Sequence, residues 1–120
     1  MKKAAIVIGK PNAGKSTTIR KFLDLDSVEK HGLHVFYIGG KRGFTWLTSF
    51  EEYGRDVEET IDGCKDDYDL LVFACQGLLL EEVHSALKKA SFTFKDVPIH
   101  HYTEATQCAD KILKFFKSNA

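Results

Sequence analysis

The spacing of apolar residues along the chain changes from one segment to the next, between short continuous runs and helical spacing. Short runs rich in β-branched and other apolar residues predict buried strands over 4–8, 33–38, 69–75 and 97–102. Apolar residues at helical spacing predict amphipathic helices over 16–30, 55–65, 78–90 and 104–117. This alternation predicts an α/β fold, a three-layer sandwich whose small, mostly parallel, four-stranded sheet is covered by helices on both faces.

The segment 41–53 fits neither period clearly. It follows Gly39-Gly40, which we expect to end the second strand, and it is rich in aromatic residues, namely Phe44, Trp46, Phe50 and Tyr53. We expect a short helix here. A small hydrophobic cluster is the favoured interpretation of the aromatic side chains, and stacking on a base or covering a ligand site is the alternative.

Composition and charge narrow the classes of function. Of the 120 residues, 43% are apolar and 28% are charged, which is typical of one globular domain over 1–120. Seventeen basic and seventeen acidic side chains cancel, so no strong attraction to nucleic acid or to an anionic membrane is expected. No apolar run approaches the roughly 20 residues that span a bilayer. The scattered Cys64, Cys75 and Cys108 favour reduced thiols in the cytoplasm.

One motif carries specific chemistry. The pattern G-x-x-x-x-G-K-[ST] is matched at every fixed position by Gly9, Lys10, Pro11, Asn12, Ala13, Gly14, Lys15 and Ser16. Glycines at both ends let the backbone curl and present successive N–H groups to a phosphate, and a following helix adds its dipole. Lys15 is then expected to contact the β- and γ-phosphates, and the hydroxyl of Ser16 to bind Mg²⁺.

With these residues the sequence resembles the P-loop NTPase superfamily, and the loop through Thr17 looks especially like GTPases of the Obg kind. The resemblance implies a P-loop NTPase-like fold and a minimal nucleotide-binding domain. It also implies nucleotide contacts from Gly9, Pro11, Asn12, Ala13, Gly14, Lys15, Ser16 and Thr17. The D-x-x-G and N-K-x-D motifs of those GTPases are missing from this chain, so the expected ligand is ATP or GTP with Mg²⁺.

The end of the third strand lacks the aspartate that holds Mg²⁺ in many P-loop proteins. Ala74 or Cys75 stands at that position, and a non-acidic end resembles small-molecule kinases of the gluconate and adenylylsulfate types. Gln76 follows and is a candidate catalytic residue that orients a water or an acceptor hydroxyl, because ligands collect at the carboxyl ends of strands. The alternative is a polar residue that begins a turn before Gly77.

The loop after the second strand supplies a candidate cationic clamp. Arg42, with Lys41, is expected at the carboxyl edge of the sheet, where it would hold an anionic substrate or a transferring phosphoryl group. Two solvated basic residues are the alternative. Glu51, Glu52 and Asp56 become candidate acids if the segment that carries them folds over the phosphates.

Two main functions fit these residues. One is a small Mg²⁺-dependent phosphotransferase or NTPase in which Lys15, Arg42 and Gln76 are catalytic, acting on a nucleoside triphosphate and an anionic small-molecule acceptor or water. The other is a nucleotide-binding switch with little turnover, which acts through a protein partner that recognises the conformation of 41–53. A loop that binds another anion without hydrolysis is a weaker third possibility.

Overall fold

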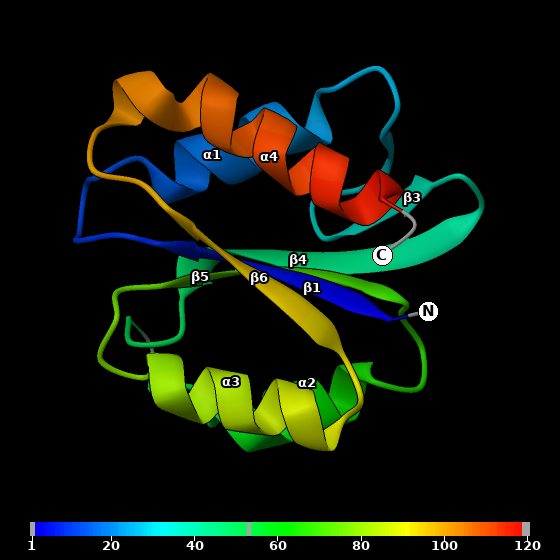
Figure 1. The fold of residues 1–120 in the computed structure, drawn as a ribbon, viewed down its shortest axis with the longest axis vertical. Coiled ribbons are helices and arrows are strands. Elements are labelled where there is room, and N and C mark those ends of the chain that lie inside the picture. The colour runs from blue at the N-terminus through cyan, green and yellow to red at the C-terminus, as the bar shows by residue number, and fades with distance from the viewer. Residues whose placement is uncertain (1, 53, 119–120) are drawn as a thin grey trace.

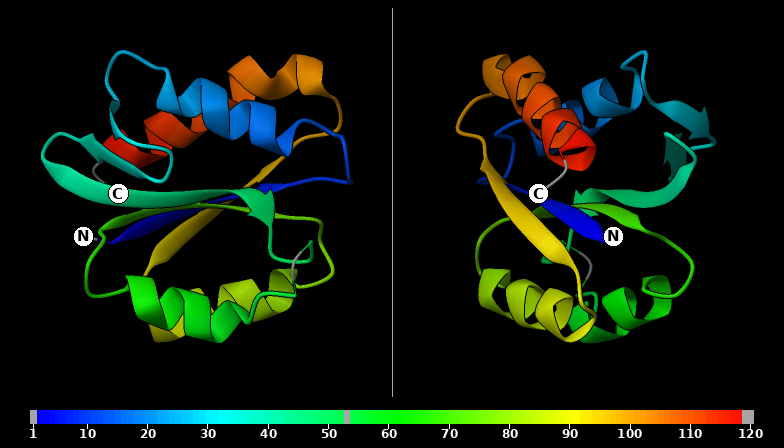
Figure 2. Two further views of the ribbon diagram at one scale, coloured as in Figure 1. Left: turned by 180° about the vertical axis from the view of Figure 1, so that it is seen from behind. Right: turned by 45° about the vertical axis from the view of Figure 1, so that its right-hand side comes forward.

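The computed structural model describes residues 2–52 and 54–118. Its strands are β1 (Lys3–Ile8), β2 (Glu29–His31), β3 (Val35–Ile38), β4 (Lys41–Ser49), β5 (Leu70–Cys75) and β6 (Thr93–Pro98). Its helices are α1 (Lys15–Leu23), α2 (Val57–Cys64), α3 (Leu80–Lys89) and α4 (Ala105–Lys117), with a 3₁₀ turn η1 (Tyr102–Glu104) before α4. Helices α1 and α4 cover one face of the sheet and α2 and α3 the other (Figure 1), and the views in Figure 2 show the same three layers.

The expected four-stranded, mostly parallel sheet is wrong. The sheet has six strands in the order β2-β3-β4-β5-β1-β6 over the described residues. Four of them, β4, β5, β1 and β6, are parallel, whereas β2 pairs with β3 and β3 with β4 in antiparallel fashion. The two additional strands are β2 and β4, and both come from segments for which the sequence pattern predicted helix.

A glycine pair is the physical reason for this error. Gly39 and Gly40 have φ values of 57° and 81°, the left-handed conformation at both central positions that a two-residue hairpin turn requires. Ile38 is therefore paired directly with Lys41. The glycines connect two antiparallel strands instead of ending a strand before a helix, and 41–49 is strand instead of the expected short helix. Tyr53 lies outside the described residues.

Two other element boundaries differ from prediction. Helix α1 ends at Leu23 instead of near residue 30, because Asp24, Asp26 and Ser27 favour turns over helix interiors. Strand β6 begins at Thr93 and ends at Pro98, about four residues earlier than expected. Its polar composition suits an edge strand, which is exposed on one side and therefore gives a weak hydrophobic pattern.

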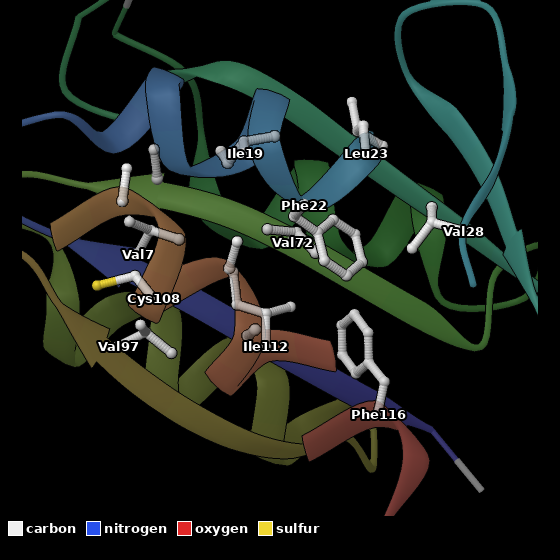
Figure 3. Packing of buried hydrophobic residues seen from close by; sticks show 14 of the residues in the cluster. Val7, Ile19, Phe22, Leu23, Val28, Val72, Val97, Cys108, Ile112 and Phe116 are labelled. Carbon is white, nitrogen blue, oxygen red and sulfur yellow. The ribbon is translucent and has the colours of Figure 1, made fainter. Parts of the chain in front are cut away.

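Buried side chains form one cluster on each face of the sheet. Along β1 the alternation is simple, since Ala5 and Val7 face α1 and α4 whereas Ala4 and Ile6 face α2 and α3. Figure 3 shows the first cluster, where Phe22 of α1 lies edge-on to Phe116 of α4, with ring centroids 5.7 Å apart. Phe22 lies in the last turn of α1, so this packing fixes that helix against α4.

Candidate functional site

The candidate site lies where the loops after β1 and β5 diverge. These strands are parallel neighbours, and the backbone N–H of Gly9 after β1 donates to the carbonyl of Cys75 at the end of β5 (3.1 Å). The loop after β1 leads to α1 on one face, whereas the loop after β5 leads to α3 on the other (Figure 1). Such a divergence opens a crevice at the carboxyl edge, where ligands bind in open α/β sheets.

The loop 9–14 is a tight curl between β1 and α1. Gly14 occupies the N-cap position with φ 105°, and as a glycine it has no side chain that could cap the first turn of α1. The N–H groups at this helix end therefore face the crevice without a capping group, as anion binding requires. The glycines are also needed for packing. A Cβ on Gly9 would lie 2.7 Å from the carbonyl oxygen of Ile99, and one on Gly14 would lie 2.6 Å from the Cα of Tyr102.

Lys15 folds back over this loop. Its side chain is only 6% exposed, and its Nζ donates to the carbonyl oxygens of Gly9 and Lys10, each at 2.7 Å. Burial lowers the pKa of Lys15 below its ordinary value, and the nearby carboxylates of Glu52 and Glu51 partly offset this effect. The ammonium is thus held inside the curl, at the position expected of a phosphate-binding lysine.

Ser16 connects the loop to strand β4. Its hydroxyl donates to the carbonyl oxygen of Leu47 at 2.7 Å. Leu47 lies in an irregular part of β4, because the register with β5 shifts between Thr45 and Ser49. Such a bulge redirects backbone groups away from the sheet ladder. Because Ser16 donates its hydroxyl proton to Leu47, the lone pairs of its oxygen remain available to coordinate a metal ion.

A cavity of about 470 Å³ lies in front of these groups. Its lining residues are Asn12, Gly14, Lys15, Ser16, Thr17, Glu52 and Tyr102. Of the other predicted loop residues, Pro11 is exposed and Ala13 is buried beneath the loop. Tyr102, in the turn after β6, is 59% exposed and offers an aromatic face at the side of the cavity. The structure thus brings the loop together with one acid and one aromatic ring.

These residues fit Mg²⁺ only as part of a phosphate complex. Among the described residues no group of three or more His, Cys, Asp or Glu side chains is placed to hold a metal ion. The cavity does contain hard oxygen donors, the Ser16 hydroxyl and the Glu52 carboxylate. Mg²⁺ commonly takes one or two protein oxygens and completes its coordination with phosphates and waters. When bound, such an ion neutralises charge on the phosphate oxygens.

Gln76 lies just after the end of β5, beside the loop, as expected. It forms hydrogen bonds with Ser49, the last residue of β4, and with Glu51, which follows that strand. Its side-chain Nε2 donates to Ser49 Oγ at 3.3 Å, and its backbone N–H donates to Glu51 at 2.9 Å. Glu51 also accepts from the Cys75 thiol and from the N–H of Leu79, each at 3.2 Å. The side chain of Gln76 is therefore part of a hydrogen-bonded connection between two strand ends.

The carboxylate of Glu51 accepts hydrogen bonds from the end of β5 and from the loop that follows it. Burial by itself raises the pKa of Glu51, but the hydrogen bonds from Gln76, Cys75 and Leu79 outweigh it and bring the pKa below its ordinary range. Burial raises the pKa of Cys75 to about 11. Cys75 is therefore a neutral thiol that donates to Glu51, and it has the character of a structural residue.

Arg42 does not lie at the site. Because β3 and β4 form a tight hairpin, Arg42 falls at the beginning of β4, where its carbonyl accepts from Asp69 N–H just before β5 (2.9 Å). That is the amino edge of the sheet, and the length of β5 separates it from the loop 9–14, about 20 Å at 3.3 Å per residue. Figure 1 shows the β3–β4 turn and the loop at opposite ends. The guanidinium instead covers the ring of Tyr68 at 4.7 Å.

The aromatic residues of 41–53 that the structure describes belong to the core. Phe50 is 1% exposed and packs against Phe73, with centroids 5.1 Å apart. Trp46 contacts Phe44 and Phe73, and the guanidinium of Arg55 lies 3.9 Å from its ring centroid. The favoured interpretation, a local hydrophobic cluster, agrees with this packing.

Sequence patterns did not identify three residues of the site. Tyr102 was expected inside a strand, but β6 ends at Pro98 and leaves it in an exposed turn. Leu47 contributes a backbone carbonyl and Ser49 a buried hydroxyl, and neither group has a sequence signature. Glu52 was a candidate acid only if its segment folds over the phosphates, and the structure places Glu52 in the lining of the cavity beside the loop.

A second, larger cavity of about 670 Å³ lies between α2 and α3. It is lined mainly by charged side chains, including Asp56, Glu58, Glu81, Glu82 and Lys89. It includes none of the loop 9–16, so its size does not make it the better candidate. The smaller cavity is the one lined by residues of the loop 9–16, including Lys15 and Ser16.

The described helices include none that is both long enough and apolar enough to cross a membrane. The chain matches no known protein family and no curated protein. It is similar in structure to two de novo designed proteins of the PFK fold that were solved by solution NMR. One gives a TM-score of 0.61 at 21% identity and the other 0.58 at 20% identity, each over 100% of this chain and 95% of the designed chain. At such identities the likeness shows the fold alone.

Proposed function

We propose that the protein binds a nucleoside triphosphate, ATP or GTP, together with Mg²⁺, at the loop 9–16. The observation that carries this proposal is the arrangement around the cavity. An uncapped helix start at Gly14, a buried ammonium at Lys15 and a hydroxyl at Ser16 lie together at a topological switch point. The exposed ring of Tyr102 gives a base a stacking surface, and stacking alone discriminates weakly between bases.

The favoured activity is slow transfer of the terminal phosphoryl group, to water or to a small acceptor. Lys15 would stabilise charge on the β- and γ-phosphates, and Gln76 would orient the attacking oxygen from the neighbouring strand end. Lys15 is the only cationic residue among those described as lining the cavity. With Arg42 at the opposite edge, the charge of the transferring group is stabilised less than a two-cation site would allow, which limits the rate.

A nucleotide-dependent switch is the second candidate, and one contact favours it. The hydrogen bond from Ser16 to Leu47 joins the phosphate-binding loop directly to the irregular end of β4. A change in the ligand at Ser16 would therefore alter the support of residues 47–52. A partner protein that contacts this segment would then distinguish nucleotide states, provided that the contacts differ between them. We place either activity in the cytoplasm, in keeping with three free, buried thiols.

A binding experiment tests the proposal. ATP, GTP and their diphosphates are titrated by calorimetry, with Mg²⁺ and with EDTA, into wild type, Lys15→Ala and Lys21→Ala. Lys21 is exposed on the same helix, so its variant matches the loss of charge. Lys15→Ala should weaken triphosphate binding about 10- to 100-fold, the value of one charged hydrogen bond, whereas Lys21→Ala should change it little.

Equal binding by wild type and Lys15→Ala, with both variants folded by circular dichroism, would contradict the proposal. Phosphate release separates the two activities. Sustained multiple turnover by the isolated protein supports the enzyme, whereas tight binding with less than one turnover supports the switch.

A further inference from the structure

We infer that Glu52 is the carboxylate that supports Mg²⁺ at this site, replacing an acid missing from the end of β5, and that the buried hydroxyl of Ser49 positions it. The inference rests on the proposed nucleotide binding and identifies the metal-supporting acid of that same site. Strand β5 ends with Ala74 and Cys75, neither of which is an acid. Another element must therefore supply the carboxylate.

Strand β4 brings an acid to the same place from the neighbouring position in the sheet. Its last residue, Ser49, is paired with Ala74. A turn follows in which the N–H of Glu52 donates to the carbonyl of Ser49 at 3.2 Å. This turn carries Glu52 to the cavity that it lines together with Lys15 and Ser16. The carboxylate thus comes from the turn after β4 instead of from the end of the neighbouring strand β5, but it still lies beside the loop.

The carboxylate of Glu52 is held by a buried group. Ser49 is 0% exposed, and its hydroxyl donates to Glu52 Oε1 at 3.2 Å while accepting from Gln76 Nε2 at 3.3 Å. A buried hydroxyl with both a donor and an acceptor partner has a fixed orientation. Ser49 therefore fixes Glu52 and Gln76 relative to each other, as outer hydrogen-bond partners do for metal ligands.

Charge at the cavity supports the same assignment. Glu52 and Lys15 line the same cavity, so the carboxylate lies on the side of the loop where the ammonium would contact the phosphates. Its neighbour Glu51 is occupied by the Cys75 thiol and by the N–H groups of Gln76 and Leu79. The two adjacent glutamates thus have different partners, which makes each a control for the other.

Without a metal ion, a carboxylate beside a polyphosphate repels it. Removing the charge of Glu52 should therefore have opposite effects on triphosphate affinity in the absence and in the presence of Mg²⁺. For Glu52→Gln we expect triphosphate affinity in EDTA to be unchanged or a few-fold higher. We expect the gain in affinity on adding Mg²⁺ to fall by about 10-fold or more, the usual cost of losing a metal-supporting group.

The experiment measures triphosphate affinity by calorimetry, with Mg²⁺ and with EDTA, for wild type, Glu52→Gln, Glu51→Gln, Ser49→Ala and Ser49→Thr. Glu51→Gln should retain the wild-type ratio between the two affinities, even if it is less stable. Ser49→Ala should lose part of the Mg²⁺-dependent gain, and Ser49→Thr should keep more of it because the hydroxyl remains. Unfolding in urea establishes that each variant is folded at the titration temperature.

The outcomes test the role of Glu52 separately from the proposed binding of a nucleoside triphosphate. If wild type binds triphosphate but Glu52→Gln keeps the full Mg²⁺-dependent gain, the inference is overturned and nucleotide binding stands. The same conclusion holds if Mg²⁺ has no effect on wild-type affinity. If wild type binds no triphosphate in either condition, the proposed function fails and the inference fails with it.

Discussion

Replacing Gly14 by alanine tests the geometry of the loop more directly than any change of charge. Gly14 has φ 105°, and an alanine there costs about 1–2 kcal/mol for a positive φ. Its Cβ would also lie 2.6 Å from the Cα of Tyr102. Because that neighbour is backbone, the overlap must be relieved by moving the turn before α4, which costs about a further 1–3 kcal/mol.

The total loss of stability for Gly14→Ala is therefore about 2–5 kcal/mol, or a decrease in Tm of roughly 8–20 °C for a chain of this size. Gly32→Ala is the matched control. Gly32 also has a positive φ, 82°, but among the described residues other than its chain neighbours no atom would lie within 4 Å of a Cβ added there. Only the backbone cost of about 1–2 kcal/mol applies at Gly32, so the Tm should fall by roughly 4–8 °C.

Thermal unfolding followed by circular dichroism, together with urea unfolding, measures both variants. The difference between them isolates the contact of the loop with Tyr102. Equal destabilisation by Gly14→Ala and Gly32→Ala would show that the loop does not pack against the turn after β6, and the cavity derived from that packing would have to be abandoned. Truncating the ring by Tyr102→Ala should not rescue Gly14→Ala, because the overlap is with the backbone Cα.

Two further predictions concern side chains around the sheet. Arg42→Ala should leave triphosphate affinity and phosphate release unchanged while costing about 0.5–1 kcal/mol in urea unfolding, since its guanidinium lies over Tyr68 at the opposite edge; a large loss of affinity would refute that placement. Glu51→Gln should destabilise the fold by about 1–2 kcal/mol near neutral pH. Since the folded-state pKa of Glu51 lies below its ordinary 4.5, this stabilisation exists above pH 4.5 and is lost as the pH falls through the lower folded value. Unfolding curves at successively lower pH should therefore show wild type and variant converging, and a constant difference would contradict the hydrogen bonds assigned to Glu51.

Much of the candidate site could be predicted from the sequence because its chemistry is local. A β-branched run, a glycine-rich curl and a helix start are consecutive in the chain, so their residue types alone predict an anion-binding loop at 9–16. The fully buried strands β1 and β5 have continuous apolar runs for the same reason. Whether the loop binds a triphosphate is a prediction that the proposed titrations address.

Tertiary structure decided what depends on strand pairing. The turn at Gly39-Gly40 is compatible with either the end of a strand or a hairpin, and only the pairing of Ile38 with Lys41 determines which. Because of this pairing, Arg42 lies at the amino edge of the sheet, and the end of β4, with Ser49 and Glu52, lies near the loop 9–16. Residue types in one segment indicate what it can bind. They do not indicate which distant segment faces it, because strand order and direction are set by long-range packing.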